Sequence, residues 1–191
     1  MVRAGYCWKA DLLTMARGEA DSNVDIYVNG EPLSVTKNLH DFLSVLHARR
    51  KKDKWFWADQ MCIHQAHIEE RNHQVSLMGK VYASAKEVYA FLGPGPASSK
   101  WYLRNPDNFF PAHVPDDQLD RRTEEISFAV DMLSRPYWTR LWIVQELRLA
   151  QDVVFWCGDF TFARAHLRRK QKWLVEHASR KYAYPPAIAH V

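Results

Sequence analysis

The hydrophobic pattern changes period along the chain and predicts alternating strands and helices. Residues 24–35, VDIYVNGEPLSV, alternate apolar and polar positions around Asn29-Gly30, a dipeptide typical of two-residue hairpin turns. From Thr36 to Arg50, apolar residues return every three or four positions after a threonine suited to cap a helix. We therefore expect an antiparallel hairpin followed by an amphipathic helix.

Residues 54–93 predict a strand, a helix and a second strand. A short aromatic run spans Lys54–Asp59, and a buried run that closes on glycine spans residues 86–93. Between them, residues 68–85 follow a helical period. One face of that helix carries Glu70, Gln74, Leu77, Val81 and Ala85. This order predicts a βαβ unit, in which two parallel strands are paired through a right-handed crossover.

The rest of the chain predicts further helices and a third buried strand around an irregular loop. Residues 93–118 hold five of the nine prolines and show no periodicity. Helices are expected at 121–135 and 138–150, and a buried strand at 152–160. Together these elements predict an α/β fold with an open, mostly parallel sheet, flanking helices and a short β-hairpin near the N-terminus.

Charge separates the C-terminal segment from the rest. Of the formal net charge of +4, the stretch from Arg164 to Lys181 contributes +6, with seven Lys or Arg and one Glu, which leaves about −2 for the remainder. We expect one domain at 1–163 and a basic C-terminal helix and tail at 164–191. Such basic runs are mostly solvated helix faces, so nucleic-acid binding is not expected.

No run approaches the ~18–20 apolar residues that a membrane span requires, and the first residues lack the apolar core of a signal peptide. A cytoplasmic protein without a membrane span is therefore expected. The odd number and wide spacing of Cys7, Cys62 and Cys157 predict reduced, buried thiols.

The stretch around Cys62 raises the question of a metal or thiol centre. Cys62 is followed by His64, His67 and His73, but structural zinc sites need a second ligand pair that the chain does not supply. Activation of the Cys62 thiol by a histidine is the alternative. Because Cys62 lies between Met61 and Ile63, a small buried side chain is favoured over both a metal ligand and a nucleophile.

Two carboxylates of the strand–helix region are stronger candidates. Asp59 ends a presumed parallel strand, and open α/β sheets bind ligands at the carboxyl ends of such strands. Glu70 opens the following helix, where an acid either serves a site or is a helix-end carboxylate that pairs with Arg71 or caps the backbone. Both interpretations of Glu70 stay open.

Buried polar residues mark the predicted helix 138–150. Its main stripe consists of Trp138, Leu141, Trp142, Gln145 and Leu149, and further apolar residues cover most of the remaining surface. Burial of Gln145 and Glu146 costs free energy unless they are paired or functional. Glu146 is therefore either a site carboxylate or the partner of Arg140 or Arg148.

These motifs together resemble the HET domain, the heterokaryon incompatibility domain of filamentous fungi. The stretches WFWADQMCIHQ, IEERNHQVSLMGKVYASAKEVYAFLG and RPYWTRLWIVQELRLA follow the family's order over about residues 4–160. The family-motif positions are Trp57, Asp59, Cys62, Ile63, Gln65, Glu70, Arg71, Gln74, Val75, Met78, Tyr82, Ala85, Leu92, Gly93, Trp138, Arg140, Trp142, Gln145 and Glu146.

Three features depart from the family pattern. The opening strand, AGYCWK, has Lys9 where the family has glycine, so the chain looks short at its N-terminus. His64 replaces the usual asparagine, and the chain stops soon after the domain. A missing part of the first strand would compromise folding or activity.

HET domains are similar to TIR domains, which implies a flavodoxin-like fold and, in some branches, cleavage of NAD at its nicotinamide glycosidic bond. The resemblance makes Glu146 the candidate catalytic carboxylate, with Trp142 stacking on nicotinamide and Asp59, Tyr6 and Gln145 lining the pocket. The chain has no Gly-rich dinucleotide fingerprint, so NAD would be a substrate and not a cofactor.

The resemblance also implies a role in self/non-self recognition and programmed cell death. The expected partner is a second copy of the chain or another incompatibility protein. Three hypotheses remain open at this point: a TIR-like NAD glycohydrolase, a non-enzymatic signalling module that oligomerises, and an inactive fragment.

Overall fold

The protein is described by a computed structural model. It describes residues 10–15, 23–49, 54–95, 127, 131–140, 142–158 and 160–166. The predictions for Tyr6, Cys7, most of the loop 93–118 and most of the C-terminal segment 164–191 lie outside these residues. No helix in these ranges combines the length and the apolar character needed to cross a membrane.

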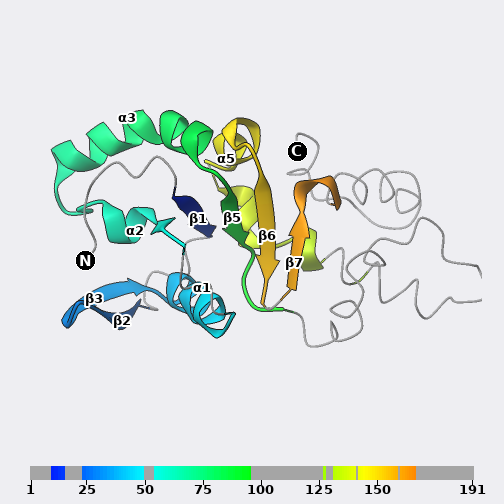
Figure 1. The fold of residues 1–191 in the computed structure, drawn as a ribbon, viewed down its shortest axis with the longest axis horizontal. Helices are drawn as coiled ribbons and strands as arrows, with labels where there is room; N and C mark the ends of the chain where they lie inside the picture. Colours follow the sequence, from blue (N-terminus) through cyan, green and yellow to red (C-terminus); the bar gives the residue numbers. More distant parts are fainter. Residues whose placement is uncertain are drawn as a thin grey trace, which may run out of the picture.

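A five-stranded sheet forms the centre of the fold (Figure 1). Its strands are β1 (Asp11–Met15), β4 (Phe56–Trp57), β5 (Val88–Phe91), β6 (Val153–Cys157) and β7 (Phe160–Ala163). They lie in the order β4-β1-β5-β6-β7, and only β7 is antiparallel to its neighbour. Counted along the chain, this is the order 2-1-3-4-5 of flavodoxin-like folds. The predicted open, mostly parallel sheet is confirmed.

The predicted direct pairing of the two strands in residues 54–93 is wrong. β4 and β5 are parallel, but β1 lies between them and pairs with both. The sequence pattern did not predict β1, because Asp11 and Thr14 place polar residues at positions that are buried in the fold. It also missed β7, which returns from β6 after Gly158.

The predicted hairpin and the helix after it are confirmed. β2 (Asn23–Val28) and β3 (Glu31–Thr36) form a separate two-stranded sheet. Asn29 and Gly30 have positive φ values of 55° and 90°, as a tight hairpin turn with the native twist requires. α1 (Lys37–Ala48) begins at Thr36, whose side chain accepts a hydrogen bond from the backbone NH of Leu39.

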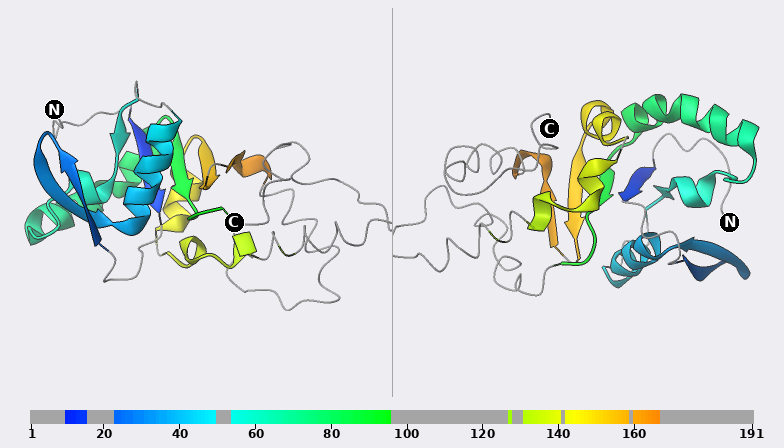
Figure 2. Two further views of the ribbon diagram at one scale, coloured as in Figure 1. Left: turned by 90° about the horizontal axis from the view of Figure 1, so that it is seen from below. Right: turned by 180° about the vertical axis from the view of Figure 1, so that it is seen from behind.

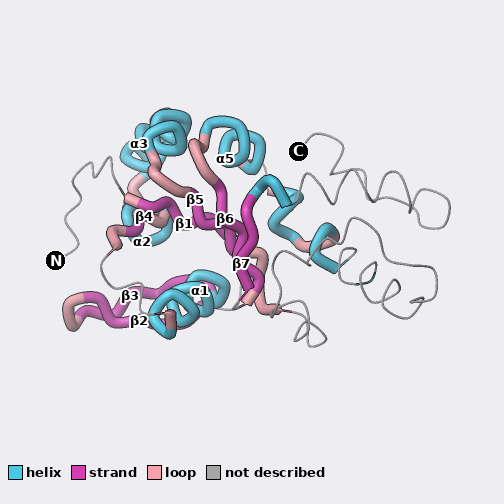
Figure 3. The backbone as a smooth tube through the Cα atoms, turned by 45° about the vertical axis from the view of Figure 1, so that its right-hand side comes forward, coloured by secondary structure: helices cyan, strands magenta, loops and turns pink. Residues whose placement is uncertain are grey.

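Helices cover both faces of the main sheet. α3 (Ile68–Ser84) and α5 (Ile143–Leu149) lie on one face, and α1 with the hairpin lies on the other (Figures 2 and 3). Alternate strand residues enter the two layers: Leu12 and Phe155 pack in one apolar cluster, whereas Leu13 and Trp156 pack in the other. The result is a three-layer α/β architecture.

The predicted helix 138–150 is interrupted. Residues 136–139 form a single 3-10 turn, η3 (Pro136–Thr139), and α5 begins only at Ile143. Arg140 between them has an extended backbone, with φ −73° and ψ 140°. Likewise, the strand expected to reach Asp59 ends at Trp57, because Asp59 opens the one-turn helix α2 (Asp59–Cys62).

Candidate functional site

Glu146 lies in a buried polar network. It is in the first turn of α5 and has 0% of its surface exposed. Its Oε2 accepts hydrogen bonds from the Tyr137 hydroxyl at 2.6 Å and from Arg140 Nη1 at 3.3 Å. Its Oε1 accepts one from the Tyr82 hydroxyl at 3.1 Å and lies 3.0 Å from Arg140 Nη2. Each oxygen therefore has two donors, which compensates the burial of the charge.

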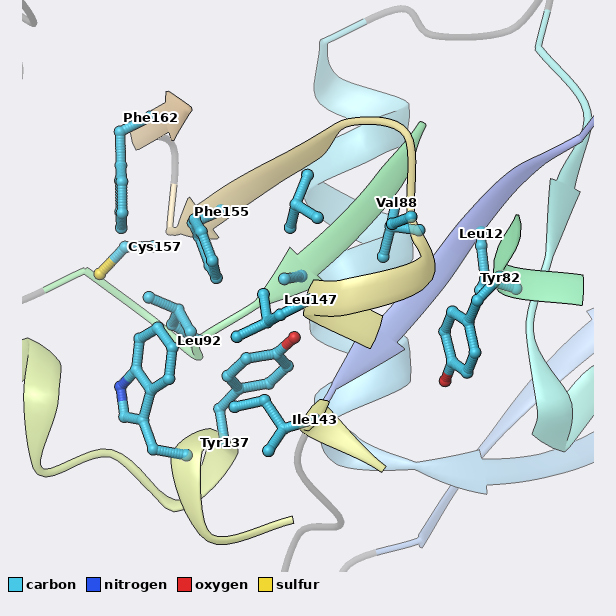
Figure 4. Packing of buried hydrophobic residues seen from close by; sticks show 14 of the residues in the cluster. Leu12, Tyr82, Val88, Leu92, Tyr137, Ile143, Leu147, Phe155, Cys157 and Phe162 are labelled. Atoms are coloured by element: carbon cyan, nitrogen blue, oxygen red, sulfur yellow. The ribbon is translucent and has the colours of Figure 1, made fainter. Parts of the chain in front are cut away.

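The network joins segments that are far apart in the sequence. Tyr82 comes from α3, Tyr137 from η3 and Glu146 from α5. The Tyr137 hydroxyl also lies 3.4 Å from Thr14 Oγ1, near the carboxyl end of β1. Figure 4 shows both tyrosines within the packed apolar cluster. In the 2-1-3-4-5 strand order, β4 lies on one side of β1 and the later strands lie on the other, so β1 and β5 flank the topological switch point of the sheet. Such folds bind ligands in the crevice at this point.

Arg140 connects the network to the surface. The extended backbone at this residue ends η3, and the guanidinium group presents two nitrogens to the Glu146 carboxylate. It also lies 5.5 Å from the centroid of the Tyr137 ring. The Arg140 side chain is 20% exposed. The ion-pair interpretation of Glu146 is thus confirmed, with Arg140 as the partner.

The tyrosines stay protonated near neutral pH. Burial raises the pKa of Tyr82 and of Tyr137 well above the ordinary value, and the negative charge of Glu146 raises both further. Asp59 contributes to the raised pKa of Tyr82 as well.

The corner from Asp59 to Glu70 bonds mainly to its own backbone. Asp59 Oδ1 accepts a hydrogen bond from the backbone NH of Gln60 at 2.8 Å, and Gln65 Nε2 donates to the Asp59 carbonyl at 2.9 Å. Glu70 Oε1 accepts from the backbone NH of His64 at 3.2 Å, and His67 Nδ1 accepts from that of Glu70 at 3.1 Å. Glu70 thus bonds to the backbone that leads into α3, whereas the side chain that caps the helix is that of His67.

Two predicted binding residues, Trp142 and Gln145, and the family-motif residue Trp138 lie around the network without joining it. Trp142 is partly buried, and its carbonyl accepts the backbone NH of Glu146 at 3.0 Å. Gln145 carries a buried Oε1 that has no hydrogen-bond partner among the described residues. Trp138 is buried and donates through Nε1 to the Met132 carbonyl at 2.7 Å, which is a structural contact.

Three further family-motif residues lie outside the network. Trp57 is partly buried and packs against the apolar cluster. Gln74 is half-buried on α3, and Arg71 is exposed near the start of that helix. These positions show that the family motif spans a surface corner as well as the core.

Both cysteines within the described residues are free thiols with raised pKa values. Cys157 is buried, as expected, and burial raises the pKa of its thiol to about 11. Cys62 is only partly buried, contrary to the expectation, because α2 is a single turn without a buried residue. Burial still raises the pKa of Cys62, so little thiolate forms at neutral pH. Within the described ranges, no group of three His, Cys, Asp or Glu residues is arranged to hold a metal ion.

A second charged cluster lies at the opposite end of the sheet. Lys54 Nζ lies 2.7 Å from Asp11 Oδ2 and 3.3 Å from Glu87 Oε2, and it donates a hydrogen bond to the Tyr89 hydroxyl. Partial burial alone would lower the pKa of Lys54, but the bonds to Asp11 and Tyr89 raise it instead. This cluster ties together the amino ends of β1, β4 and β5.

The sequence pattern did not place Tyr137 and Thr14 in the site, and it marked Tyr82 only as a family-motif position. One signal for them was available, because a buried carboxylate needs several donors and tyrosine supplies a hydroxyl on an apolar ring. The pattern could not show which tyrosine approaches Glu146, since that depends on the tertiary packing of α3, η3 and α5.

Comparisons with known proteins agree with this motif. The sequence model of the family "Heterokaryon incompatibility protein (HET)" matches residues 5–146. The chain is 30% identical over 169 residues to "Heterokaryon incompatibility protein 6, OR allele" of Neurospora crassa, covering 66% of this chain and 24% of that protein. The chain thus spans about a quarter of the length of this relative. No solved structure matches. Since the family model covers well over half of the chain, the protein belongs to the heterokaryon incompatibility (HET) family.

Proposed function

We propose that this chain is a HET module that acts in fungal self/non-self recognition and triggers programmed cell death. The match to the HET family over residues 5–146 carries the proposal. The relative from Neurospora crassa, named as a heterokaryon incompatibility protein, supports it. That relative is about four times as long as the aligned part, so the module works there beside other segments.

The geometry of Glu146 favours a signalling module without catalytic activity. A catalytic carboxylate must touch the substrate, but Glu146 is fully buried and both of its oxygens hold two protein donors. Opening this arrangement would leave the Arg140 charge and two tyrosine hydroxyls without their acceptor, at a cost of several kcal/mol. Glu146 in this proposal stabilises the module and does not react.

TIR-like hydrolysis of NAD is the second candidate, and the position of the network favours it. Through Tyr137 and Thr14, Glu146 lies near the carboxyl end of β1, beside the point where the strand order reverses. In this reaction water replaces nicotinamide at the ribose carbon, which yields nicotinamide, ADP-ribose and a proton. Glu146 would stabilise the oxocarbenium-like ribose. Trp142 would stack on nicotinamide, and Asp59, Gln145 and Tyr6 would line the pocket.

The two candidates differ in what purified protein does to NAD. We expect no nicotinamide release by chromatography at any protein concentration, while expression of the chain in a filamentous fungus kills cells. The variants to compare are Glu146→Gln and Glu70→Gln. Glu70→Gln is the matched control, because Glu70 is also a family-motif carboxylate but belongs to the corner from Asp59 to Glu70.

Each outcome decides between the candidates. Nicotinamide release that is lost in Glu146→Gln but kept in Glu70→Gln, with both variants folded by circular dichroism, would overturn the signalling module in favour of hydrolysis. Normal viability on expression of the wild-type chain at full soluble level would contradict the proposed role in cell death.

A further inference from the structure

The hairpin of β2 and β3 is a small sheet with two edges of its own. In the described part of the chain its strands pair only with each other, and neither joins the main sheet. Figures 1 and 3 show β3 between β2 and the main sheet, so β2 lies on the outer side. α1 supports one face of the hairpin, where Ile26, Leu33 and Val35 pack. The two edges are therefore the places where another strand can pair.

The backbone groups of the hairpin alternate in direction. Val28 and Glu31 flank the two-residue turn, so they and every second residue beyond them bond across the hairpin. The residues between them direct their backbone groups outward, away from the partner strand. These residues are Asn23, Asp25 and Tyr27 on β2, and Pro32, Ser34 and Thr36 on β3.

The outer edge of β3 is blocked. Pro32 has no backbone NH, and the NH of Thr36 donates to Gln60 Oε1 at 3.1 Å. Only Ser34 then keeps its outward NH for a new strand, which is too little for a ladder of hydrogen bonds. Natural sheets protect their edges with such prolines and side-chain contacts.

The outer edge of β2 is open. The outward backbone groups of Asn23, Asp25 and Tyr27 have no hydrogen-bond partner among the described residues. β2 contains no proline, lysine or bulge that would prevent pairing. The Tyr27 side chain beside this edge is 77% exposed. An edge of this kind accepts an extended peptide as an additional strand.

Charge indicates which kind of strand fits β2. Residues 23–36 include two acids, Asp25 and Glu31, and no Lys or Arg. Asp25 is exposed and forms no ion pair within the described ranges. A basic residue opposite Asp25 would form an attractive cross-strand pair, whereas a second copy of β2 would bring its own Asp25 beside the first. A basic strand of a different protein is therefore favoured over a second copy.

We propose that the edge of β2 binds a strand of a partner protein in which basic and apolar residues alternate. The basic residues lie on the solvent side with Asp25 and Tyr27, and the apolar residues continue the side of Ile26, which packs on the core. Backbone hydrogen bonds hold the strand, and the alternating side chains select it.

This binding site deepens the proposed signalling module and rests on it for its biological meaning, because it specifies the class of partner. The edge does not involve Glu146, whose tyrosine partners pack in the apolar cluster on the other face of the main sheet. Strand binding and cell killing can therefore be measured separately.

The test is titration of the purified chain with a short capped peptide that alternates lysine and valine. The matched control peptide has glutamate in place of every lysine. We expect the lysine peptide to bind about tenfold more tightly, because attractive pairs with Asp25 replace repulsive ones. Amide hydrogen exchange followed by NMR should slow at Asp25 and Tyr27. Exchange at Ile26 should not change, because its NH already bonds to β3.

Three variants separate edge pairing from a general attraction to charge. Tyr27→Pro removes an outward NH of β2 and should abolish binding, whereas Ser34→Pro, the matched control on the blocked edge of β3, should not weaken it. Neither NH bonds within the hairpin, so both variants should keep it. Asp25→Lys should reverse the preference and bind the glutamate peptide more tightly, which also shows that this variant is folded.

Several results would overturn the proposal. These are equal binding of both peptides to the wild-type chain, no slowing of exchange at Asp25 and Tyr27, and equal effects of Tyr27→Pro and Ser34→Pro. Self-association of the wild-type chain in analytical ultracentrifugation that is lost in Tyr27→Pro would assign the edge to a second copy instead. Peptide binding by a chain that does not kill cells would contradict only the proposed function.

Discussion

The two halves of the family motif perform different structural tasks. The first half, from Asp59 to Glu70, lies at the surface and bonds mainly to its own backbone within a few residues. The second half, from Tyr137 to Glu146, lies in the core and reaches α3 and β1. Local bonds set the entry into α3, whereas the Glu146 network fixes how α3, η3 and α5 pack. Substitutions in the second half should therefore cost far more stability.

Among the substitutions that compare the two halves, removal of Arg140 should cause the largest loss of stability. Arg140→Leu leaves the Glu146 charge buried without a cation, and we expect the free energy of unfolding to fall by about 3–5 kcal/mol. Arg148→Leu, on the exposed side of α5, should change it by less than about 0.5 kcal/mol. Urea denaturation measures both. Equal losses of unfolding free energy in the two variants would show that the ion pair between Arg140 and Glu146 does not stabilise the fold.

Alkaline pH should destabilise the core half of the motif more than the surface half. Tyr82 and Tyr137 have folded-state pKa values above their unfolded value, so their contribution to stability is fully present below pH ~10. Above that pH the unfolded chain loses these protons first, and the free energy of unfolding should fall steadily. The Tyr137→Phe variant should have a lower free energy of unfolding at pH 7, and this free energy should fall less steeply with pH above pH 10. An unchanged slope in this variant, followed by urea denaturation across pH, would exclude Tyr137 as the cause.

Loss of the helix cap should have a smaller effect. His67→Ala removes the acceptor for the backbone NH of Glu70, and we expect a loss of about 1 kcal/mol. His67→Asn retains a capping side chain and should recover most of that loss. Hydrogen exchange of the first turn of α3 is the direct measurement. Faster exchange in His67→Asn than in His67→Ala would contradict the capping role.

The smallest effect should come from Gln65. Within the described ranges, its side chain makes a single hydrogen bond, an exposed one to the Asp59 carbonyl. Gln65→Ala should therefore reduce the free energy of unfolding by no more than about 0.5–1 kcal/mol, measured by thermal denaturation. A loss as large as that of Arg140→Leu would remove the distinction between the two halves of the motif.

Much of the fold was predictable because its signals are local. The hairpin at Asn29-Gly30, the Thr36 cap and the length of α3 depend on neighbouring residues, and each was found where the pattern placed it. β1 was missed because buried Asp11 is paired with Lys54 across the sheet, and that partner is invisible in a hydrophobic pattern. The break at Arg140 was missed because its extended backbone serves a contact with Glu146, not a local preference.

The candidate site was predictable only in part. Glu146 was singled out, and Arg140 was named among its partners, because a buried carboxylate on an apolar helix requires a cation. The sequence could not show that Tyr82, 64 residues earlier, donates to the same carboxylate. That contact arises when α3 and α5 pack on one face of the sheet, which no local pattern encodes.

The most direct test of the central claim compares one substitution in the two halves of the motif. Glu146→Gln and Glu70→Gln each replace a family-motif carboxylate with its amide, and the free energy of unfolding by urea denaturation is measured for both. The structural role of the network predicts a loss of about 3 kcal/mol for Glu146→Gln and less than about 1 kcal/mol for Glu70→Gln. Unchanged or increased stability of Glu146→Gln, as is common when a catalytic residue is removed, would contradict it.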